Sequence, residues 1–281
     1  TGDLGNTPTP LLRDTEDLSD ANYVVMESVY GDRNHEPMEE RRNKLEDVIE
    51  DVIRQNGVLM IPSFSLEKTQ VIIYELNRLI EEGRVMHIPV FIDSPLAIKV
   101  TDIYRKHQNE FNEMAQQFMG KDRDLFNFKG IRFTSTSEES KAIKYTPNPK
   151  IIIAGSGMSN GGRITHHELN YLPDPQSTLL LIGYQSVGTL GRQLLEGAKS
   201  ISMYGQTAQV KAKVVSIDGY SSHKDSDHLI SFVEKSIDTL EKVFVVMGET
   251  KSSTFLVQRL RDYLGINAYH PEEGSSVMLD F

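Results

Sequence analysis

His223 lies in the stretch of the chain best suited to chemistry, 214–225, which reads VVSIDGYSSHKD. An apolar run ends at Gly219, and a polar turn places the histidine where a helix is expected to begin, with Ser221 or Ser222 as its cap. Open α/β sheets carry their reactive groups at the carboxyl ends of strands. The position therefore indicates a catalytic histidine, although a histidine that only completes a helix cap fits it equally well.

Glu27 follows an apolar run at 23–26 that predicts a strand, and it opens the segment ESVYGDR. A carboxylate in this place could orient a histidine, as acids do behind metal-bound imidazoles. An acid that merely starts a turn has the same sequence signature. The residues alone leave both interpretations open.

Two glycine-rich loops follow expected strands, GSGMSNGGR at 155–163 and GYQSVGTLGR at 183–192. Glycine allows a ligand to approach the backbone closely, and successive N–H groups can surround an anion. Turn geometry is the alternative for the glycines, and pairing with a carboxylate is the alternative for the arginines. The residues proposed to contact phosphate are Gly155, Ser156, Gly157, Gly161, Gly162, Arg163, Gly188, Thr189 and Arg192.

The other histidines show no metal-ligand spacing. His166 and His167 are adjacent and point in different directions on a helix, so we expect them to pack or to form hydrogen bonds. His228 is five residues after His223, which is outside the spacing of three or four that places two side chains on one helix face. The chain has no cysteine, so any metal must be held by histidine and carboxylate groups.

Strands and helices are expected to alternate along nearly the whole chain, which predicts an α/β fold with a largely parallel sheet. Expected strands include 58–62, 150–154, 178–182, 210–217 and 242–247. Expected helices include 36–54, 66–82, 97–118, 224–237 and 251–264, and 120–124 is expected to be a charged loop. The small, glycine-rich turns would then gather at one edge of the sheet.

Composition limits the classes of protein that fit. The 281 residues carry a formal net charge of −10, which argues against broad, nonspecific binding of polyanions but permits a nucleic acid in a local cleft. No apolar run approaches the roughly 20 residues that span a bilayer, and no positively charged apolar leader precedes the first strand. We therefore expect a cytoplasmic protein with no membrane partner.

Taken together, the motifs resemble the β-CASP branch of the metallo-β-lactamase superfamily, the RNA- and DNA-processing nucleases. The segments that carry the resemblance are TGDLG at 1–5, MESVYGDR at 26–33, YSSHKD at 220–225 and both glycine loops. The resemblance covers nearly the whole chain. It implies the carboxyl-terminal part of a metallo-β-lactamase αββα domain (1–34 and 206–281) with an inserted β-CASP α/β domain at 35–205.

The resemblance also implies roles for single residues. Asp3 would bridge two zinc ions, and Glu27 would support the catalytic His223 beside the scissile phosphate. The glycine loops would bind the RNA backbone. The implied protein is a zinc-dependent ribonuclease acting on single-stranded RNA as an endonuclease, a 5′ exonuclease or both, and a homodimer is left open.

The chain departs from the family pattern in two ways. The chain begins at the TGD turn, so the family's His-x-His-x-Asp-His motif and a further metal-binding histidine are missing. Met247 stands where the family has a zinc-binding histidine before Gly-Glu, and a thioether is a poor zinc ligand beside oxygen and imidazole. We therefore expect this chain to hold a partial active site that is inactive by itself.

Two other classes of protein fit parts of the sequence. A metal-poor paralogue that binds RNA or a partner protein without cleaving it would explain Met247. An enzyme for a nucleotide sugar or dinucleotide would explain the glycine turns, but the chain lacks a G-x-G-x-x-G run followed by a ribose-binding acid. The RNA-processing nuclease accounts for more of the sequence than either.

Overall fold

The structure is a computed structural model that describes residues 1–119 and 124–279. The chain divides into two compact units. Unit 1 comprises Thr1–Thr9, Asp14–His35 and Ser222–Phe281, and unit 2 comprises Pro10–Arg13 and Glu36–Ser221. The sequence placed the domain boundaries at 34/35 and 205/206, and most of the predicted charged loop at 120–124 lies outside the described residues.

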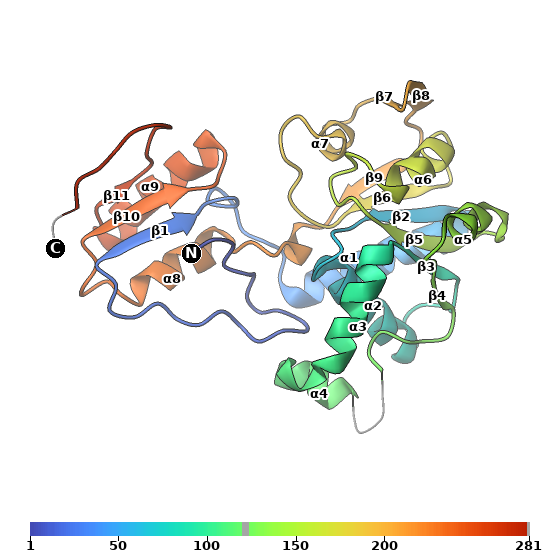
Figure 1. The fold of residues 1–281 in the computed structure, drawn as a ribbon, viewed down its shortest axis with the longest axis horizontal. Coiled ribbons are helices and arrows are strands. Elements are labelled where there is room, and N and C mark those ends of the chain that lie inside the picture. Colours follow the sequence, from blue (N-terminus) through green and yellow to red (C-terminus); the bar gives the residue numbers. More distant parts are fainter. Residues whose placement is uncertain (120–123, 280–281) are drawn as a thin grey trace. The chain divides into compact units, whose positions relative to one another are not determined.

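Unit 2 is built on a six-stranded parallel sheet with the order β4-β3-β5-β2-β6-β9 (Figure 1). Its strands are β2 (Val58–Pro62), β3 (Val90–Asp93), β4 (Ile131–Phe133), β5 (Lys150–Ala154), β6 (Thr178–Leu181) and β9 (Lys213–Ser216). β2 and β5 are buried along their whole length, as expected for a parallel sheet covered on both faces. The predicted α/β class with a parallel sheet is confirmed.

Alternate residues of these strands enter two different cores, because neighbouring side chains of a strand point to opposite faces. Leu59 and Ile61 pack in the core that includes residues of four helices: α1 (Met38–Gln55), α2 (Lys68–Glu81), α3 (Pro95–Lys106) and α4 (Glu113–Met119). Val58 and Met60 pack in the core on the other face. That core includes residues of α6 (Arg163–Tyr171), α7 (Leu190–Leu195), and the hairpin β7 (Ser200–Met203) and β8 (Gln206–Gln209).

The single helix expected at 97–118 is wrong. α3 ends at Lys106, a 3₁₀ turn covers Gln108–Glu110, and α4 begins at Glu113. Asn112 explains the new start, because its side-chain oxygen accepts a hydrogen bond of 2.8 Å from the Ala115 N–H and so caps α4. The helical spacing of apolar residues continued through this break and concealed it.

The β7–β8 hairpin was not expected from the sequence. Its two strands have only four residues each, so the alternation of exposed and buried residues in Ser200–Met203 is too short to predict a strand. Tyr204 and Gly205 connect them with φ values of 50° and 72°. Positive φ at both central residues is the backbone of a tight hairpin turn.

Unit 1 contains a three-stranded parallel sheet of order β1-β10-β11, formed by Tyr23–Glu27, Lys242–Val246 and Ala268–Tyr269. α8 (Ser226–Glu234) and α9 (Thr250–Leu264) share its core with Met26 and Val243 (Figure 1). α8 begins later than expected, and its cap is Asp225 rather than Ser221 or Ser222, because the Asp225 carboxylate accepts the His228 N–H at 2.9 Å.

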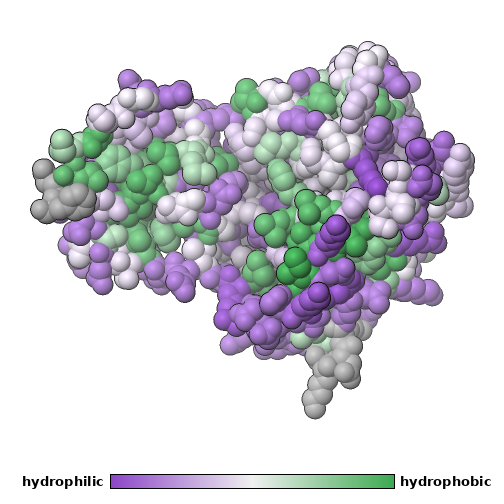
Figure 2. All heavy atoms as spheres, viewed as in Figure 1, coloured by the Kyte–Doolittle hydropathy of each residue, from purple (hydrophilic) through white to green (hydrophobic). Residues whose placement is uncertain are grey.

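Hydrophilic residues cover much of the face shown in Figure 2. A hydrophobic region lies over the part of unit 2 where Figure 1 draws α2 and α3, and exposed Phe64, Leu66 and Leu96 belong to the turns and helix starts there. Within residues 1–119 and 124–279, no helix combines the length and the hydropathy needed to cross a membrane.

Candidate functional site

Glu27 and His223 form a direct pair in unit 1. The Glu27 carboxylate is completely buried at the end of β1, and its Oε2 lies 2.6 Å from Nδ1 of His223. Its other oxygen accepts a hydrogen bond of 2.6 Å from the Leu4 N–H. Because an ionised carboxylate only accepts hydrogen bonds, Nδ1 of the imidazole is the donor. Nε2 is then the ring nitrogen that would act on a substrate.

Asp3 lies beside this pair. Its Oδ1 is 3.9 Å from Nδ1 of His223, and 60% of its side chain is exposed. The Leu4 bond to Glu27 holds the turn in place, together with a 3.3 Å hydrogen bond from the Glu27 N–H to the Thr1 hydroxyl. Unit 1 therefore brings together the three residues that the sequence assigned to catalysis and metal binding, although His223 lies 196 residues after Glu27 in the chain.

Asp225 and His35 hold the turn that carries His223, and the sequence did not reveal this. Asp225 Oδ2 accepts the His35 N–H at 3.1 Å, and Oδ1 lies 2.6 Å from Nδ1 of His228. The His35 ring donates from Nε2 to the His223 carbonyl at 2.9 Å. Burial would raise the pKa of Asp225, but hydrogen bonds from His228 and from the His35 backbone lower it to about 2. Two turns are thus joined through one ionised carboxylate.

The 155–163 loop is closed largely by its own hydrogen bonds. The Ser156 N–H donates to the Gly161 carbonyl at 3.1 Å. Gly162 has φ +75°, and a Cβ there would lie 2.4 Å from the Gly155 carbonyl oxygen. A Cβ on Gly157 would lie 2.6 Å from the Phe64 ring, whereas Gly161 has open space around it. Turn geometry and close packing therefore account for Gly157 and Gly162.

Both loop arginines are ion-paired within unit 2. Arg163 donates to Asp93 at 2.8 Å and to the carbonyls of Thr134 and Ser135 at 2.9 Å. Arg192 donates to Glu196 at 2.6 Å. In the second loop Thr189 caps α7 by accepting the Arg192 N–H at 3.2 Å. A Cβ added to Gly188 would meet no atom within 4 Å. These contacts agree with the alternative that both arginines pair with a carboxylate. Contact between the loops and phosphate stays a prediction.

Asp93 is a buried charge that the sequence did not single out. It ends β3, and Arg163, His167, Thr134 and Ser140 all donate to it at 2.6–2.8 Å. Burial would raise its pKa, but the hydrogen bonds from His167, Ser140 and Thr134 lower the pKa to about 2. The position after a buried strand was visible in the sequence, but the four donors come from segments 41–74 residues away. His167 is a hydrogen-bonding residue, as expected.

Glu168 is completely buried and accepts a hydrogen bond from the Ser159 hydroxyl. Burial raises its pKa to about 7, from an ordinary value of 4.5. The folded protein therefore holds an extra proton between these two pH values. The free energy of unfolding gained from this proton is fully present below about pH 4.5 and declines as the pH rises through 7.

Glu168→Gln is expected to remove this decline, because glutamine is neutral at every pH and can still accept the Ser159 bond. At pH 8 the variant should unfold with a free energy about 1–3 kcal/mol higher than the native chain, and near pH 4 the two should be equal. Urea unfolding at both pH values measures the difference. Exposed Glu138→Gln is the control, and an equal pH dependence in native chain and Glu168→Gln would contradict the assignment.

The described residues do not fit a zinc site by themselves. Residues 1–119 and 124–279 contain no group of three or more histidine and acidic side chains placed to hold a metal ion. Zinc sites in proteins use three or four such ligands. Asp3 is suitably exposed for one ligand position, but both Glu27 oxygens already accept hydrogen bonds.

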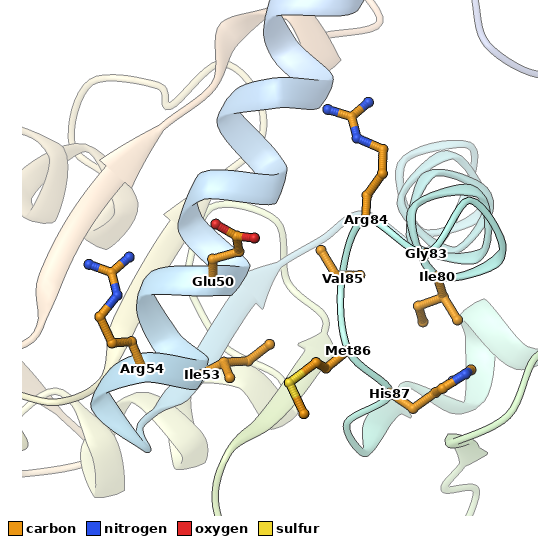
Figure 3. Close-up of a pocket in the computed structure, with 9 residues that line it drawn as sticks. All are labelled: Glu50, Ile53, Arg54, Ile80, Gly83, Arg84, Val85, Met86 and His87. Carbon is orange, nitrogen blue, oxygen red and sulfur yellow. The ribbon is translucent and has the colours of Figure 1, made fainter.

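A pocket of about 540 Å³ is lined by none of the residues of the glycine loops (Figure 3). Residues of α1 and of the 83–87 segment line it, and these precede β2 and β3. It therefore lies at the amino ends of the strands, opposite the loops that follow β5 and β6. Ile53, Val85 and Met86 surround it, and Arg84 reaches Asn43 and Glu46 on α1. Nothing in its lining connects it with the Glu27–His223 pair.

The chain is similar to known proteins over most of its length. The Beta-Casp domain model matches residues 69–194, and the model of the Zn-dependent metallo-hydrolase RNA specificity domain matches residues 207–271. A ribonuclease of Thermus thermophilus is 32% identical over 88% of this chain. An RNase J-like protein of Methanocaldococcus jannaschii is 30% identical over 98%, and the transcription termination factor FttA of Methanosarcina mazei is 28% identical over 86%.

The fold and the two family models define a protein of the metallo-β-lactamase type. The chain belongs to the β-CASP family of this superfamily, which confirms the resemblance found in the sequence. The chain spans 56%, 63% and 39% of the lengths of the Thermus, Methanocaldococcus and Methanosarcina proteins. It therefore covers about half the length of these relatives.

Proposed function

We propose that this chain is the β-CASP and carboxyl-terminal part of a hydrolase that cleaves RNA phosphodiester bonds. The observation that carries the proposal is the 2.6 Å contact between the buried Glu27 carboxylate and the His223 ring. The similarity to proteins named ribonuclease and RNase J-like supports RNA as the substrate. The RNA specificity domain model over residues 207–271 supports it as well.

His223 would act on the phosphate through Nε2, because Nδ1 is held by Glu27. In the imidazolium form, which carries a proton on each ring nitrogen, Nε2 would donate a hydrogen bond to a phosphate oxygen or give its proton to the leaving oxygen, which leaves a neutral ring with its proton on Nδ1. Glu27 would be a positioning residue that fixes the tautomer and the direction of the ring. Asp225 and His35 would hold the backbone of the turn that carries His223 and so fix the position of its ring.

The substrate we propose is single-stranded RNA held mainly through its backbone. Contacts to phosphate and sugar fix the position of a strand but carry little sequence information, so cleavage would show weak sequence preference. The backbone of Gly161 and Gly188 is accessible enough for such contact, since a Cβ there would meet nothing within 4 Å. Endonuclease and 5′ exonuclease action are equally compatible with this arrangement.

Zinc is the cofactor that family membership suggests, and Asp3 would be one of its ligands. The described residues supply no further cluster of ligands. We therefore predict that the purified 281-residue chain holds well under one zinc ion per chain and does not cleave RNA. Zinc content by mass spectrometry and cleavage of a labelled oligoribonucleotide check this. The same sample at several concentrations gives the oligomeric state and tests whether the chain forms a homodimer.

An Asp3→Ala variant is the control for the zinc measurement, because any residual zinc held by the proposed ligand should be lost and zinc bound elsewhere should remain. Robust zinc-dependent cleavage by the 281-residue chain would contradict the proposal that its metal site is partial. Cleavage that persists in a chelator would contradict zinc dependence itself.

A metal-poor protein that binds RNA without cleaving it is the second candidate. Met247 favours it, because this residue follows β10 with φ +58° and 55% exposure at the position where the family resemblance implies a zinc-binding histidine. Zinc content of the longest natural form of the protein discriminates the two. Two bound ions per chain favour the nuclease, and none favours the binder.

A further inference from the structure

A second pocket of unit 2 has a different chemical character from the rest of this acidic chain. It has a volume of about 340 Å³ and is formed by α6 and by α5 (Ser137–Ala142) with the 3₁₀ turn that follows it. The residues that line it are Ser137, Ser140, Lys141, Lys144, Arg163, His166, His167 and Asn170. Every one of them is polar, and five are basic side chains.

Asp93 offsets part of this positive charge, because it is ion-paired with Arg163. The Asp93 carboxylate is buried, and it accepts hydrogen bonds from Arg163 and His167 in the pocket wall. Glu139 belongs to the capping box of α5, where its carboxylate accepts the N–H groups of Ser135 and Thr136 at 2.8 and 2.9 Å. Lys141 and Lys144 line the pocket as well and contribute two further positive charges.

The walls of the pocket are ordered before any ligand arrives. Asp93 fixes the Arg163 and His167 side chains, and the Thr134 and Ser135 carbonyls hold the Arg163 guanidinium in one orientation. The His166 ring stacks on Tyr204 with centroids 5.1 Å apart and an angle of 14°. Prior ordering of binding groups reduces the conformational entropy that a ligand must overcome.

We propose that this pocket binds a phosphate ester, supplied either by a free nucleotide or by a nucleotide of an RNA strand. Lysine and arginine side chains are the usual partners of phosphate oxygens, and serine and asparagine donors complete such sites. A volume near 340 Å³ is at the small end of ligand pockets, about 300–1,000 Å³, and suits one nucleotide. The proposal goes beyond the cleavage reaction, because the Glu27–His223 pair belongs to unit 1 and binding here requires no cleavage.

The test is binding of two probes to the 281-residue chain at low salt. The first is adenosine 5′-monophosphate, followed through NMR shifts of the His166 ring. The second is a fluorescent decameric oligoribonucleotide, followed by anisotropy. Lys141→Gln/Lys144→Gln removes the two exposed charges of the pocket, whereas Lys106→Gln/Lys129→Gln removes two exposed charges elsewhere in the same unit.

We expect the Lys141/Lys144 variant to bind at least one probe about tenfold more weakly, and the Lys106/Lys129 variant to bind within about twofold of the native chain. If the Lys141/Lys144 variant loses affinity for the mononucleotide, a free nucleotide is a sufficient ligand. If it loses affinity for the oligonucleotide alone, the ligand is a nucleotide of an RNA strand. Circular dichroism checks that both variants are folded. Equal affinities in the two double variants, or no binding of either probe to the native chain, would overturn the proposal.

Discussion

Replacing His223 with alanine is expected to lower turnover on RNA by about 10²–10⁴-fold in a form of the protein that cleaves RNA. The affinity for RNA should change by less than about threefold, because one imidazole is a small part of the contacts that hold a strand. Single-turnover kinetics with a labelled RNA separate the two quantities. The physical reason is the fixed tautomer: Glu27 holds Nδ1 at 2.6 Å and directs Nε2 to the substrate.

Glu27→Gln provides the matched test of positioning. Glutamine keeps the shape and can accept from Nδ1 of His223 through its carbonyl oxygen, but it lacks the negative charge, so we expect an intermediate loss of about 10–100-fold in turnover. His87→Ala, a histidine outside the pair, should leave turnover unchanged. Equal losses of turnover and affinity in His223→Ala would show that the histidine binds RNA and does no chemistry.

Asp93→Asn is expected to lower the free energy of unfolding by about 2 kcal/mol at neutral pH. The pKa of this aspartate is about 2 in the folded chain, against an ordinary value of 3.8. A carboxyl group with a depressed folded pKa stabilises the protein above its unfolded pKa, and that contribution is lost as the pH falls toward 2. In the variant, Arg163 and His167 keep a neutral acceptor but lose the charged one.

The pH profile identifies the cause of this destabilisation. Urea unfolding between pH 7 and pH 2 should show the native chain losing its advantage over Asp93→Asn in the interval from about 4 to 2. Asp47→Asn, an exposed aspartate on α1, should follow the native profile. A constant difference at every pH would assign the effect to packing and would contradict the charge argument.

The sequence predicted the fold class because continuous apolar runs such as Val58–Pro62 are typical of strands covered on both faces. It also pointed to Glu27 and His223, because each ends a strand-and-turn segment with a reactive side chain. It did not predict the Asp93 cluster or the Asp225–His35 contacts, which depend on partners from distant segments. The break before Glu113 was hidden because a cap made by a single asparagine has almost no pattern.

The two oxygens of Glu27 link the turn that carries Asp3 with the His223 ring. One oxygen receives the Leu4 amide, which belongs to the turn bearing Asp3, and the other receives the His223 ring. Placement of that turn and orientation of the imidazole therefore depend on one carboxylate, and any coupling free energy between the two is the same in both directions. Binding of a cation by Asp3 would then restrict the orientations of the His223 ring. Binding of a phosphate by that ring would raise the affinity of Asp3 for the cation.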